Sequence, residues 1–249
     1  MFHIILKIRY WQVPIFCVLL DNIMKNNSAK ILLGLTGKTS DEIMEKISDC
    51  NNRYIKEASL FLEFLEKPEK EKVYSALLNS KIKSIPLVHI RHDMFSEELG
   101  FLKTKFKTKY FTLHEINFQH DDILRWKGFY KNLYLEMNFD DFVSKKVKVE
   151  KIAGFCVDLA HFKVGMETLN KDFDYVNARK ENKKYFICSH LNGWNSKINR
   201  DMHTIHSFDN FDYLKTMPKF LLGKCVALET FNPIKEQLEF KKYLTKFLQ

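Results

Sequence analysis

Residues 153–165 read AGFCVDLAHFKVG, and this stretch decides the fold. Its first part, Ala153–Leu159, is almost continuously apolar, as expected for a strand that is buried on both faces of a parallel sheet. The run contains one carboxylate near its end, Asp158, and a histidine, His161, follows three residues later. Charged side chains at the end of a buried strand are typical of the active-site edge of an α/β protein.

Seven further apolar runs of high β-propensity lie on both sides of this stretch. They are Ile31–Thr36, Ser59–Leu65, Ile85–Ile90, Tyr110–Ile116, Asn132–Met137, Tyr185–Leu191 and Cys225–Thr230. Amphipathic, charge-rich segments that we expect to be helices lie between several of them: Thr39–Asn51, which Ser40 would cap, Lys70–Asn79, Ser96–Lys105, Asp121–Lys127 and Pro233–Leu248. Eight strands that alternate with helices predict an α/β fold, a single-domain (β/α)8 TIM barrel.

An open doubly wound sheet is the alternative architecture for such an alternation. Such a sheet normally carries a glycine-rich phosphate turn after its first strand. The corresponding segment here, LTGKTS at residues 35–40, contains neither GxGxxG nor GxxxxGK[ST]. The closed barrel is therefore favoured.

The composition excludes several classes of protein. The 249 residues are 45% hydrophobic and 29% charged, which is typical of a globular domain and not of a disordered chain. Five cysteines, at positions 17, 50, 156, 188 and 225, form no CxxC pair. They predict reduced thiols in a cytoplasmic protein, not a disulfide framework or a cysteine zinc site. The net charge of +9 is compatible with a nucleic-acid partner but does not by itself indicate one.

The first part of the chain stands apart from the alternating pattern. Its apolar stretch, Trp11–Leu20, is too short to span a bilayer and lacks a small-residue cleavage site, so we expect no membrane association. We expect residues 1–29 to form an irregular or helical extension, with Met24 as a candidate for the natural start, and residues 30–249 to form the barrel.

Side chains that can bind metals follow the predicted strands, near the carboxyl end of each. The candidate metal ligands are His89, His114, Glu136, Asp158, His161, His190, Asp201, His203 and Glu229. In a parallel barrel these strand ends converge on one mouth. Carboxylates gathered there would repel one another unless cations were present, and the imidazoles supply neutral nitrogen ligands suited to Zn2+, Mn2+ or Fe. The pattern therefore predicts a multinuclear metal site.

Three motifs carry a resemblance to a known superfamily. CVDLAHFKVG at residues 156–165 contains D-x-x-H, CSHLNGWNSKINRDMH at residues 188–203 contains a strand-end H-L-N followed by D-x-H, and ALETFNP at residues 227–233 contains L-E-T-x-N-P. These motifs resemble those of the xylose-isomerase-like barrels. That superfamily includes sugar isomerases and epimerases and the endonuclease IV family of abasic-site nucleases.

In the endonuclease IV family the nine positions bind three zinc ions, with Glu136 as the bridging ligand. The resemblance implies a phosphodiester hydrolase that uses two or three Zn2+ ions and cleaves DNA on the 5′ side of abasic sites, with Glu136 and Glu229 as catalytic residues. Loops at the same mouth offer four substrate-binding side chains, Lys163, Trp194, Lys197 and Arg200. The glycine-rich segment that usually follows D-x-H in this family is replaced by TIHSFDN at residues 204–210.

The sugar isomerases and epimerases of the superfamily imply a different chemistry. There, Glu136, Asp158, His190 and Glu229 would hold one Mn2+ or Mg2+ ion. Glu136 and Glu229 would then act as an acid–base pair beside the carbonyl of a sugar or sugar phosphate. A barrel that has lost activity and serves as a binding module is a third interpretation, although no ligand position is missing. The sequence does not indicate an oligomeric state.

Overall fold

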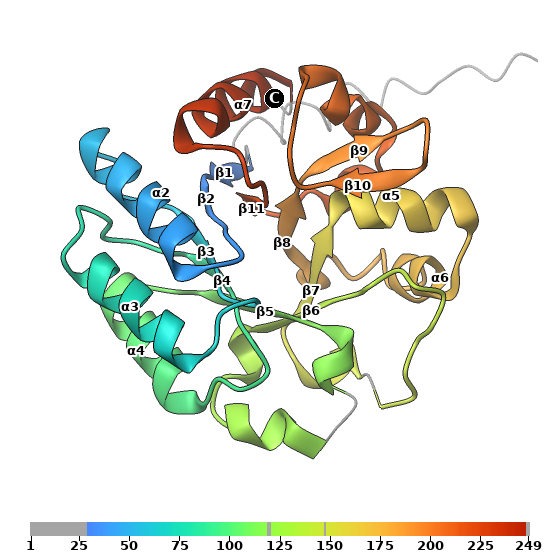
Figure 1. The fold of residues 1–249 in the computed structure, drawn as a ribbon. Helices are drawn as coiled ribbons and strands as arrows, with labels where there is room; N and C mark the ends of the chain where they lie inside the picture. The colour runs from blue at the N-terminus through green and yellow to red at the C-terminus, as the bar shows by residue number, and fades with distance from the viewer. Residues whose placement is uncertain (1–28, 119–120, 147, 248–249) are drawn as a thin grey trace, which may run out of the picture.

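The computed structural model of the chain describes residues 29–118, 121–146 and 148–247, so residues 1–28 of the expected extension lie outside the described residues. Among the described residues, nine parallel strands form one sheet in the order β1-β11-β8-β7-β6-β5-β4-β3-β2. They are β1 Lys30–Leu32, β2 Gly34–Leu35, β3 Ser59–Phe61, β4 Leu87–His89, β5 Tyr110–His114, β6 Leu133–Glu136, β7 Gly154–Asp158, β8 Phe186–Leu191 and β11 Cys225–Leu228. The sheet curves into a nearly closed barrel with helices around it (Figure 1).

The two ends of the sheet meet at the first strand segment. β1 pairs with β11 and β2 pairs with β3, and a single residue, Leu33, separates β1 from β2. The Gly34 N–H donates to Gln237 Oε1 at 2.7 Å, and the Gly34 carbonyl accepts from Gln237 Nε2 at 3.0 Å, so a buried side chain takes the place of a neighbouring strand. A Cβ at Gly34 would lie 1.9 Å from the Leu228 carbonyl oxygen, so this close approach requires glycine. All eight predicted strands are present, but the first is interrupted, which gives nine strands instead of eight.

The α-helices of the described residues lie outside the barrel (Figure 1). They are α2 Ser40–Asn52, α3 Lys67–Leu78, α4 Ser96–Phe106, α5 Leu159–Thr168, α6 Lys171–Asn177 and α7 Ile234–Phe247. The N-cap of α2 is Thr39 and not the predicted Ser40, because the Thr39 hydroxyl accepts from the Glu42 N–H at 3.4 Å. No helix in the described part of the chain has both the length and the apolar character needed to cross a bilayer.

The connections after β5, β6 and β8 depart from the predicted alternation. They contain the 3₁₀-helices η2 Glu115–Phe118, η3 Asp121–Trp126, η4 Tyr130–Asn132, η5 Val149–Lys151, η7 Phe208–Thr216 and η8 Lys219–Leu221, and η6 Lys183–Tyr185 precedes β8. The helix predicted at Asp121–Lys127 is η3, because so short a segment rarely sustains an α-helix and Gly128, at φ +93°, turns the chain after it. After β8, a hairpin of β9 Gly193–Asn195 and β10 Arg200–Met202 precedes η7. The α/β barrel is therefore present without a strictly eightfold repeat.

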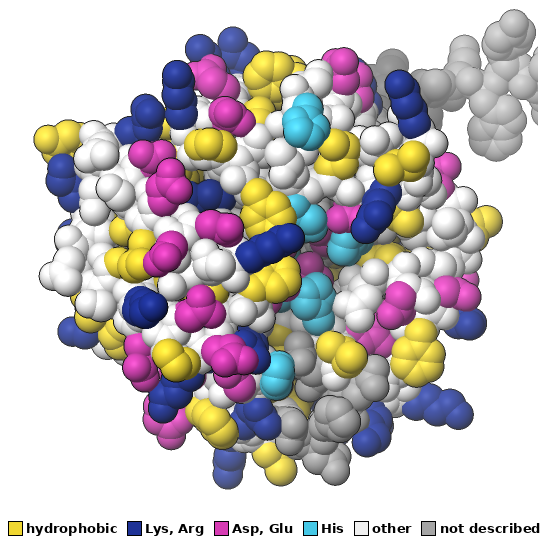
Figure 2. Space-filling model, viewed as in Figure 1, with side chains coloured by type: hydrophobic (Ala, Val, Ile, Leu, Met, Phe, Trp, Pro, Cys, Tyr) yellow, Lys and Arg dark blue, Asp and Glu magenta, His cyan; other side chains and the backbone are white. Residues whose placement is uncertain are grey.

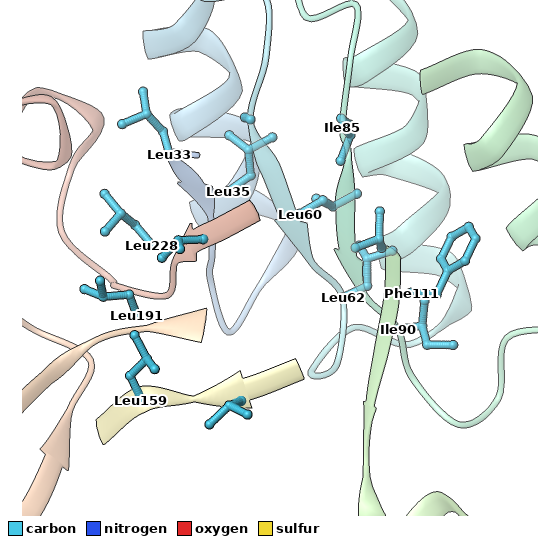
Figure 3. Packing of buried hydrophobic residues seen from close by; sticks show 14 of the residues in the cluster. Leu33, Leu35, Leu60, Leu62, Ile85, Ile90, Phe111, Leu159, Leu191 and Leu228 are labelled. Carbon is cyan, nitrogen blue, oxygen red and sulfur yellow. The ribbon is translucent and has the colours of Figure 1, made fainter. Parts of the chain in front are cut away.

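Side chains of the strands alternate between two packed layers. Leu33, Leu35, Leu60 and Phe111 belong to a cluster that includes buried residues of the helices, and they therefore face outward (Figure 3). A second cluster consists of strand residues and fills the barrel interior: Leu32, Phe61, Leu87, Tyr134, Cys156, Cys188, Cys225 and Ala227. These three cysteines and Cys50 are buried free thiols.

Two buried carboxyl groups, Glu115 and Asp172, lie near the loop after β6, and Glu115 binds this loop by a hydrogen bond. Glu115, directly after β5, is 1% exposed, Asp172 on α6 is fully buried, and Glu115 Oε1 accepts from the Ser144 N–H at 2.7 Å. Burial raises the pKa of Glu115 to about 7 and that of Asp172 to about 6, and the charge of Asp140 adds to both shifts. The folded protein therefore keeps protons here that the unfolded chain loses at the same pH.

We expect the free energy of unfolding to fall as the pH rises from about 4 to about 7, because the folded state binds more protons than the unfolded state in this range. The two shifts together correspond to at most about 6 kcal/mol, because one pKa unit is worth about 1.4 kcal/mol. Denaturant titrations of the chelator-treated chain at about pH 5 and about pH 8 measure the change. Glu115→Gln should reduce the fall, and the exposed Glu181→Gln should not. An equal fall in both variants and the wild type would show that the pair does not titrate in this way.

Candidate metal centre

The alternation that fills the barrel interior with apolar side chains also delivers the site residues. In five strands a polar residue follows two positions after an interior apolar one, so it points into the same interior one layer higher. The pairs are Leu87 and His89, Tyr134 and Glu136, Cys156 and Asp158, Cys188 and His190, and Ala227 and Glu229. Parallel pairing sets Asp158 beside His190, and His114 beside Glu136. Figure 2 shows histidine and acidic side chains near the centre of this face, and most of its lysine and arginine side chains lie around the margin.

The most deeply buried group, which we call the buried group, consists of His89, Glu136, His190 and Glu229. His190 Nδ1 lies 3.0 Å from Glu136 Oε2 and 3.2 Å from Glu229 Oε2, and His89 Nε2 lies 3.8 Å from Glu136 Oε2. Asp158 forms a further group with Glu136 and Glu229, in which the three candidate ligand oxygens lie within 4.8 Å of one another. Three buried carboxylates at this spacing repel one another unless positive charge lies between them.

Two hydrogen bonds fix the position of Asp158. Asp158 is the N-cap of α5, and its Oδ1 accepts from the His161 N–H at 2.8 Å. Its Oδ2 accepts from Asn192 Nδ2, also at 2.8 Å. The cap places His161 in the first turn of α5, so the D-x-x-H segment supplies side chains to two neighbouring groups.

The second of these groups, which we call the outer group, consists of His161, Asp201 and His203. Asp201 lies on β10 of the hairpin, and His203 follows that strand. The Nε2 atoms of His161 and His203 lie 3.3 and 3.2 Å from one oxygen, Asp201 Oδ2. Two imidazoles that converge on a single carboxylate oxygen form a compact potential ligand set for a cation.

A third group contains a residue that the sequence did not indicate as a ligand. Glu63 Oε2 lies 3.0 Å from His114 Nε2 and 3.5 Å from His89 Nδ1. Glu63 stands two residues after Phe61, which faces the barrel interior, so it continues the same alternation. The sequence predicts a strand up to Leu65, which places Glu63 inside the strand and not after its end. The observed β3 ends at Phe61, so Glu63 lies beyond the strand end, where the other candidate ligands also lie. All nine predicted ligands belong to the buried group, to the outer group, to the group of Glu136, Asp158 and Glu229, or to this third group with Glu63.

Contacts between carboxylates and imidazoles set the charge of the buried group. Burial acts to raise the pKa of Glu136, but His190, His89 and His114 outweigh it and hold this pKa well below its usual range. Burial acts to lower the pKa of His190, but Glu136 and Glu229 raise it well above its ordinary value. Burial lowers the pKa of His89. Without a bound cation, protonated imidazole supplies the positive charge between the carboxylates, and a metal would take over this role as protons leave.

The outer group has the same electrostatic pattern. Close contacts with His161 and His203 hold the pKa of Asp201 far below its usual range. Burial acts to lower the pKa of both histidines, but Asp158 and Asp201 raise that of His161 to about 10, and Asp201 and Glu229 raise that of His203 to about 9. Asp158 differs, since burial and the charges of Glu229 and Glu136 raise its pKa despite the opposing effect of His161.

Several buried polar atoms of the site make no hydrogen bond of regular geometry within the described residues. They are both ring nitrogens of His89, Nδ1 of His114, His161 and His190, and Oε2 of Glu136 and Glu229. Buried polar atoms without partners are costly, and in folded proteins they are rare. All of these atoms are imidazole nitrogens or carboxylate oxygens, which are the usual ligands of Zn2+, Mn2+ and Fe. The donor set therefore fits divalent metal ions.

Thr112 on β5 orients one of the imidazoles. Its hydroxyl lies 3.3 Å from His190 Nε2 in the buried interior. If Nε2 carries the proton and donates to Thr112, the lone pair of Nδ1 faces Glu136 and Glu229, where a cation would bind. A partner of this kind fixes the tautomer and the ring orientation of a ligating histidine.

Thr112→Val should therefore lower the affinity for Zn2+ by about 10- to 100-fold while keeping the shape of the side chain. Competition with a chromophoric chelator measures the affinity. Thr108→Val is the matched control, because Thr108 is also buried and its hydroxyl donates to the Leu102 carbonyl at 3.2 Å away from the site. Equal affinities for the two variants would rule out the orienting role.

The four predicted substrate-binding residues have different surroundings. Lys163 is 7% exposed and is paired with Glu167, and its Nζ lies 5.2 Å from the ring centre of Trp194. Trp194 Nε1 donates to Asn199 Oδ1 at 3.1 Å, so the indole is held within the hairpin. The other two predicted residues, Lys197 and Arg200, are exposed on the same hairpin.

A small pocket of about 130 Å³ adjoins the outer group. Its lining includes His161, Asp201, Arg200 and Asn138. Arg200 is therefore the predicted substrate-binding residue that lies in a pocket with two of the candidate ligands. The pocket therefore joins an exposed hairpin residue to side chains that could bind a metal ion.

No family model, curated protein or solved structure matches this chain.

Proposed function

We propose that the protein is a metal-dependent phosphodiester hydrolase that resembles the endonuclease IV family and cleaves DNA on the 5′ side of abasic sites. The proposal includes a (β/α)8 barrel of the xylose-isomerase-like type, in which β1 and β2 count as one strand. It also includes two or three Zn2+ ions held by the nine predicted ligands, with Glu63 as an additional neighbour of His89 and His114.

One observation carries the proposal: His161, Asp201 and His203 form a potential metal site of their own. Both imidazole Nε2 atoms lie within 3.3 Å of Asp201 Oδ2. An isomerase that works with one cation does not need this group. A hydrolase benefits from it, because cations on both sides of a phosphate can neutralise the attacking and the leaving oxygens.

Bound divalent cations would lower the pKa of water and neutralise charge on the phosphoryl group. The protein side chains would hold and orient the reacting groups. Glu136, between the imidazoles of His89 and His190, would help to hold the cations. Glu229, on the other side of His190 Nδ1, would orient the attacking water and take up its proton.

The hairpin would contact the substrate. Arg200, next to Asp201, and Lys197, in the turn of the hairpin, are exposed and would bind phosphates that flank the abasic nucleotide. A sugar without a base leaves the duplex at low cost, so it could enter the mouth of the barrel. Trp194, held beside Lys163, offers part of an indole face at the rim.

A nicking assay on a duplex that contains a single tetrahydrofuran abasic analogue tests the proposal. The zinc-loaded chain should cleave the phosphodiester 5′ to the analogue, and a chelator should stop the reaction. The same duplex with an intact nucleotide is the control. Absence of nicking at high protein concentration with zinc present would reject the repair activity.

A sugar isomerase or epimerase is the second candidate, and a specific contact favours it. Glu136 Oε2 and Glu229 Oε2 lie 3.0 and 3.2 Å from the same nitrogen, His190 Nδ1, so the two carboxylates face one another as an acid–base pair would. Together with Asp158 and His190, these two carboxylates would hold one Mn2+ or Mg2+ ion. Incubation of pentose and hexose phosphates with the Mn2+-loaded chain, followed by chromatography, tests this activity.

A further inference from the structure

A second and larger cavity lies beside the candidate metal centre, between α2 and the segment after β11. Its volume is about 370 Å³, which lies in the usual range for small-molecule sites. Its lining contains Thr36, Phe231 and Pro233, two lysines, Lys38 and Lys46, and three carboxylates, Glu42, Glu45 and Asp49. None of these residues belongs to the metal-binding groups described above.

Lys46 is the unusual residue of this cavity. It is 6% exposed, and its ammonium group donates to the Thr230 carbonyl at 2.9 Å. No carboxylate oxygen of the described residues lies within 4.0 Å of its Nζ. Burial lowers the pKa of Lys46 to about 8. A buried cation without an adjacent counter-ion is costly, and a bound anion would remove much of this cost.

Two threonine hydroxyl groups near Lys46 have no hydrogen-bond partner among the described residues. Thr36 is 2% exposed and Thr230 is fully buried, and neither Oγ1 makes a hydrogen bond within the described residues. Thr36 lines the cavity, and Thr230 lies behind Lys46, which its backbone carbonyl contacts. Hydroxyl and ammonium groups can all donate hydrogen bonds, so this wall is suited to a ligand that accepts them.

The other charged groups around the cavity leave room for a small anion next to Lys46. Lys38 Nζ lies 5.5 Å from the ring centre of Phe231, and α2 begins nearby, so the positive end of its dipole lies close to the cavity. Glu42 and Glu45 are exposed, and Glu42 Oε2 already accepts from the Lys38 N–H at 2.6 Å. Asp49 is half-buried in the same lining. The charges of Glu42 and Glu45 act to raise the pKa of Lys46, but its burial outweighs them, so these carboxylates compensate the buried ammonium only in part.

The cavity adjoins the reaction site. Thr230 follows Glu229 directly, and the Phe231 ring lies 5.7 Å from the His203 ring. We propose that this cavity is an anchoring subsite for a phosphoryl group of the substrate, bound by Lys46 and Thr36, with Thr230 next to Lys46. The inference rests on the proposed function for the nature of the substrate, which would place one phosphate here and another at the metal centre. A sugar phosphate would use the same anchor through its terminal phosphoryl group.

Methyl NMR spectroscopy of the zinc-loaded full chain, labelled at threonine, tests this inference with inorganic phosphate as the probe. Phosphate in the cavity should shift the methyl signals of Thr36 and Thr230, and phosphate at the metals should shift that of Thr112, which contacts His190. Lys46→Met should weaken the Thr36 and Thr230 response by about tenfold or more. Lys72→Met, at an exposed lysine of α3, is the control and should leave the response unchanged.

Thr36→Val gives an independent test if Lys46→Met does not fold, because valine keeps the shape and removes the unpartnered hydroxyl. It should weaken the Thr230 response by about threefold or more. A shift confined to Thr112, or an unchanged affinity in both variants, would overturn the inference. So would an equal response to ribose, because the cavity would then recognise hydroxyl groups and not a phosphoryl group.

Two further ligands separate the sources of the phosphoryl group. An abasic oligonucleotide that shifts Thr36 more strongly than ribose 5-phosphate supports a nucleic-acid anchor, and the reverse order supports a sugar-phosphate anchor. Lys46-dependent shifts without nicking would reject the nuclease and keep the subsite. Nicking without these shifts would reject the subsite alone.

Discussion

Glu229→Gln should reduce turnover by about 10³-fold or more, on a phosphodiester or on a sugar substrate. Glu229 is 4% exposed, and its Oε2 faces His190 Nδ1 at 3.2 Å. Glutamine keeps the shape of the side chain but removes the negative charge, which both candidate reactions need to hold a cation and to take up a proton. Because the change is isosteric, the loss should appear in kcat and in metal content while the fold is retained.

The effect is measured as kcat on the active substrate together with the far-UV circular dichroism spectrum and the midpoint of thermal unfolding. Glu239→Gln on the exposed face of α7 is the matched control and should behave as the wild type does. Turnover retained in Glu229→Gln would mean that the reaction takes place elsewhere in the molecule.

Asp201→Ala should separate the two candidate functions. Asp201 Oδ2 joins His161 and His203, and removal of this carboxylate leaves two imidazoles without the charge that brings them together. A hydrolase that uses the outer cation should lose about 10³-fold or more in rate and about one metal ion per chain. An isomerase that uses the buried group alone should lose about tenfold or less.

Paired assays on the abasic duplex and on sugar phosphates, with metal analysis of the same samples, give this comparison. Asp174→Ala, at an exposed position in the first turn of α6, controls for loss of a carboxylate. Similar modest losses on both substrate classes, with an unchanged metal content, would mean that the outer group does not bind metal.

The barrel and most of the candidate site follow from a local pattern. Each buried strand is apolar, and the period of two puts every second side chain into the interior. A polar residue at that period, such as His89 after Leu87 or Asp158 after Cys156, must therefore point into the mouth. This relation can be read from the sequence without knowledge of the long-range contacts.

Features that depend on distant contacts could not be predicted in this way. The break at Leu33 arises because the Gln237 amide, from the last helix, pairs with Gly34. The part played by Glu63 depends on where β3 ends, and a run of apolar residues up to Leu65 does not mark that point. The sequence predicts Ser40 as the cap of α2, one residue after the observed cap Thr39, because both are good capping residues.

Metal analysis of the purified full chain tests the central claim most directly. The chain is equilibrated with Zn2+, freed of unbound ions, and its zinc content is measured by plasma mass spectrometry against protein concentration. The buried and outer groups together predict two or three zinc ions per chain, reduced by about one in Asp201→Ala. A chain that retains no divalent ion under these conditions would contradict the proposal that these carboxylates and imidazoles are gathered to bind metal.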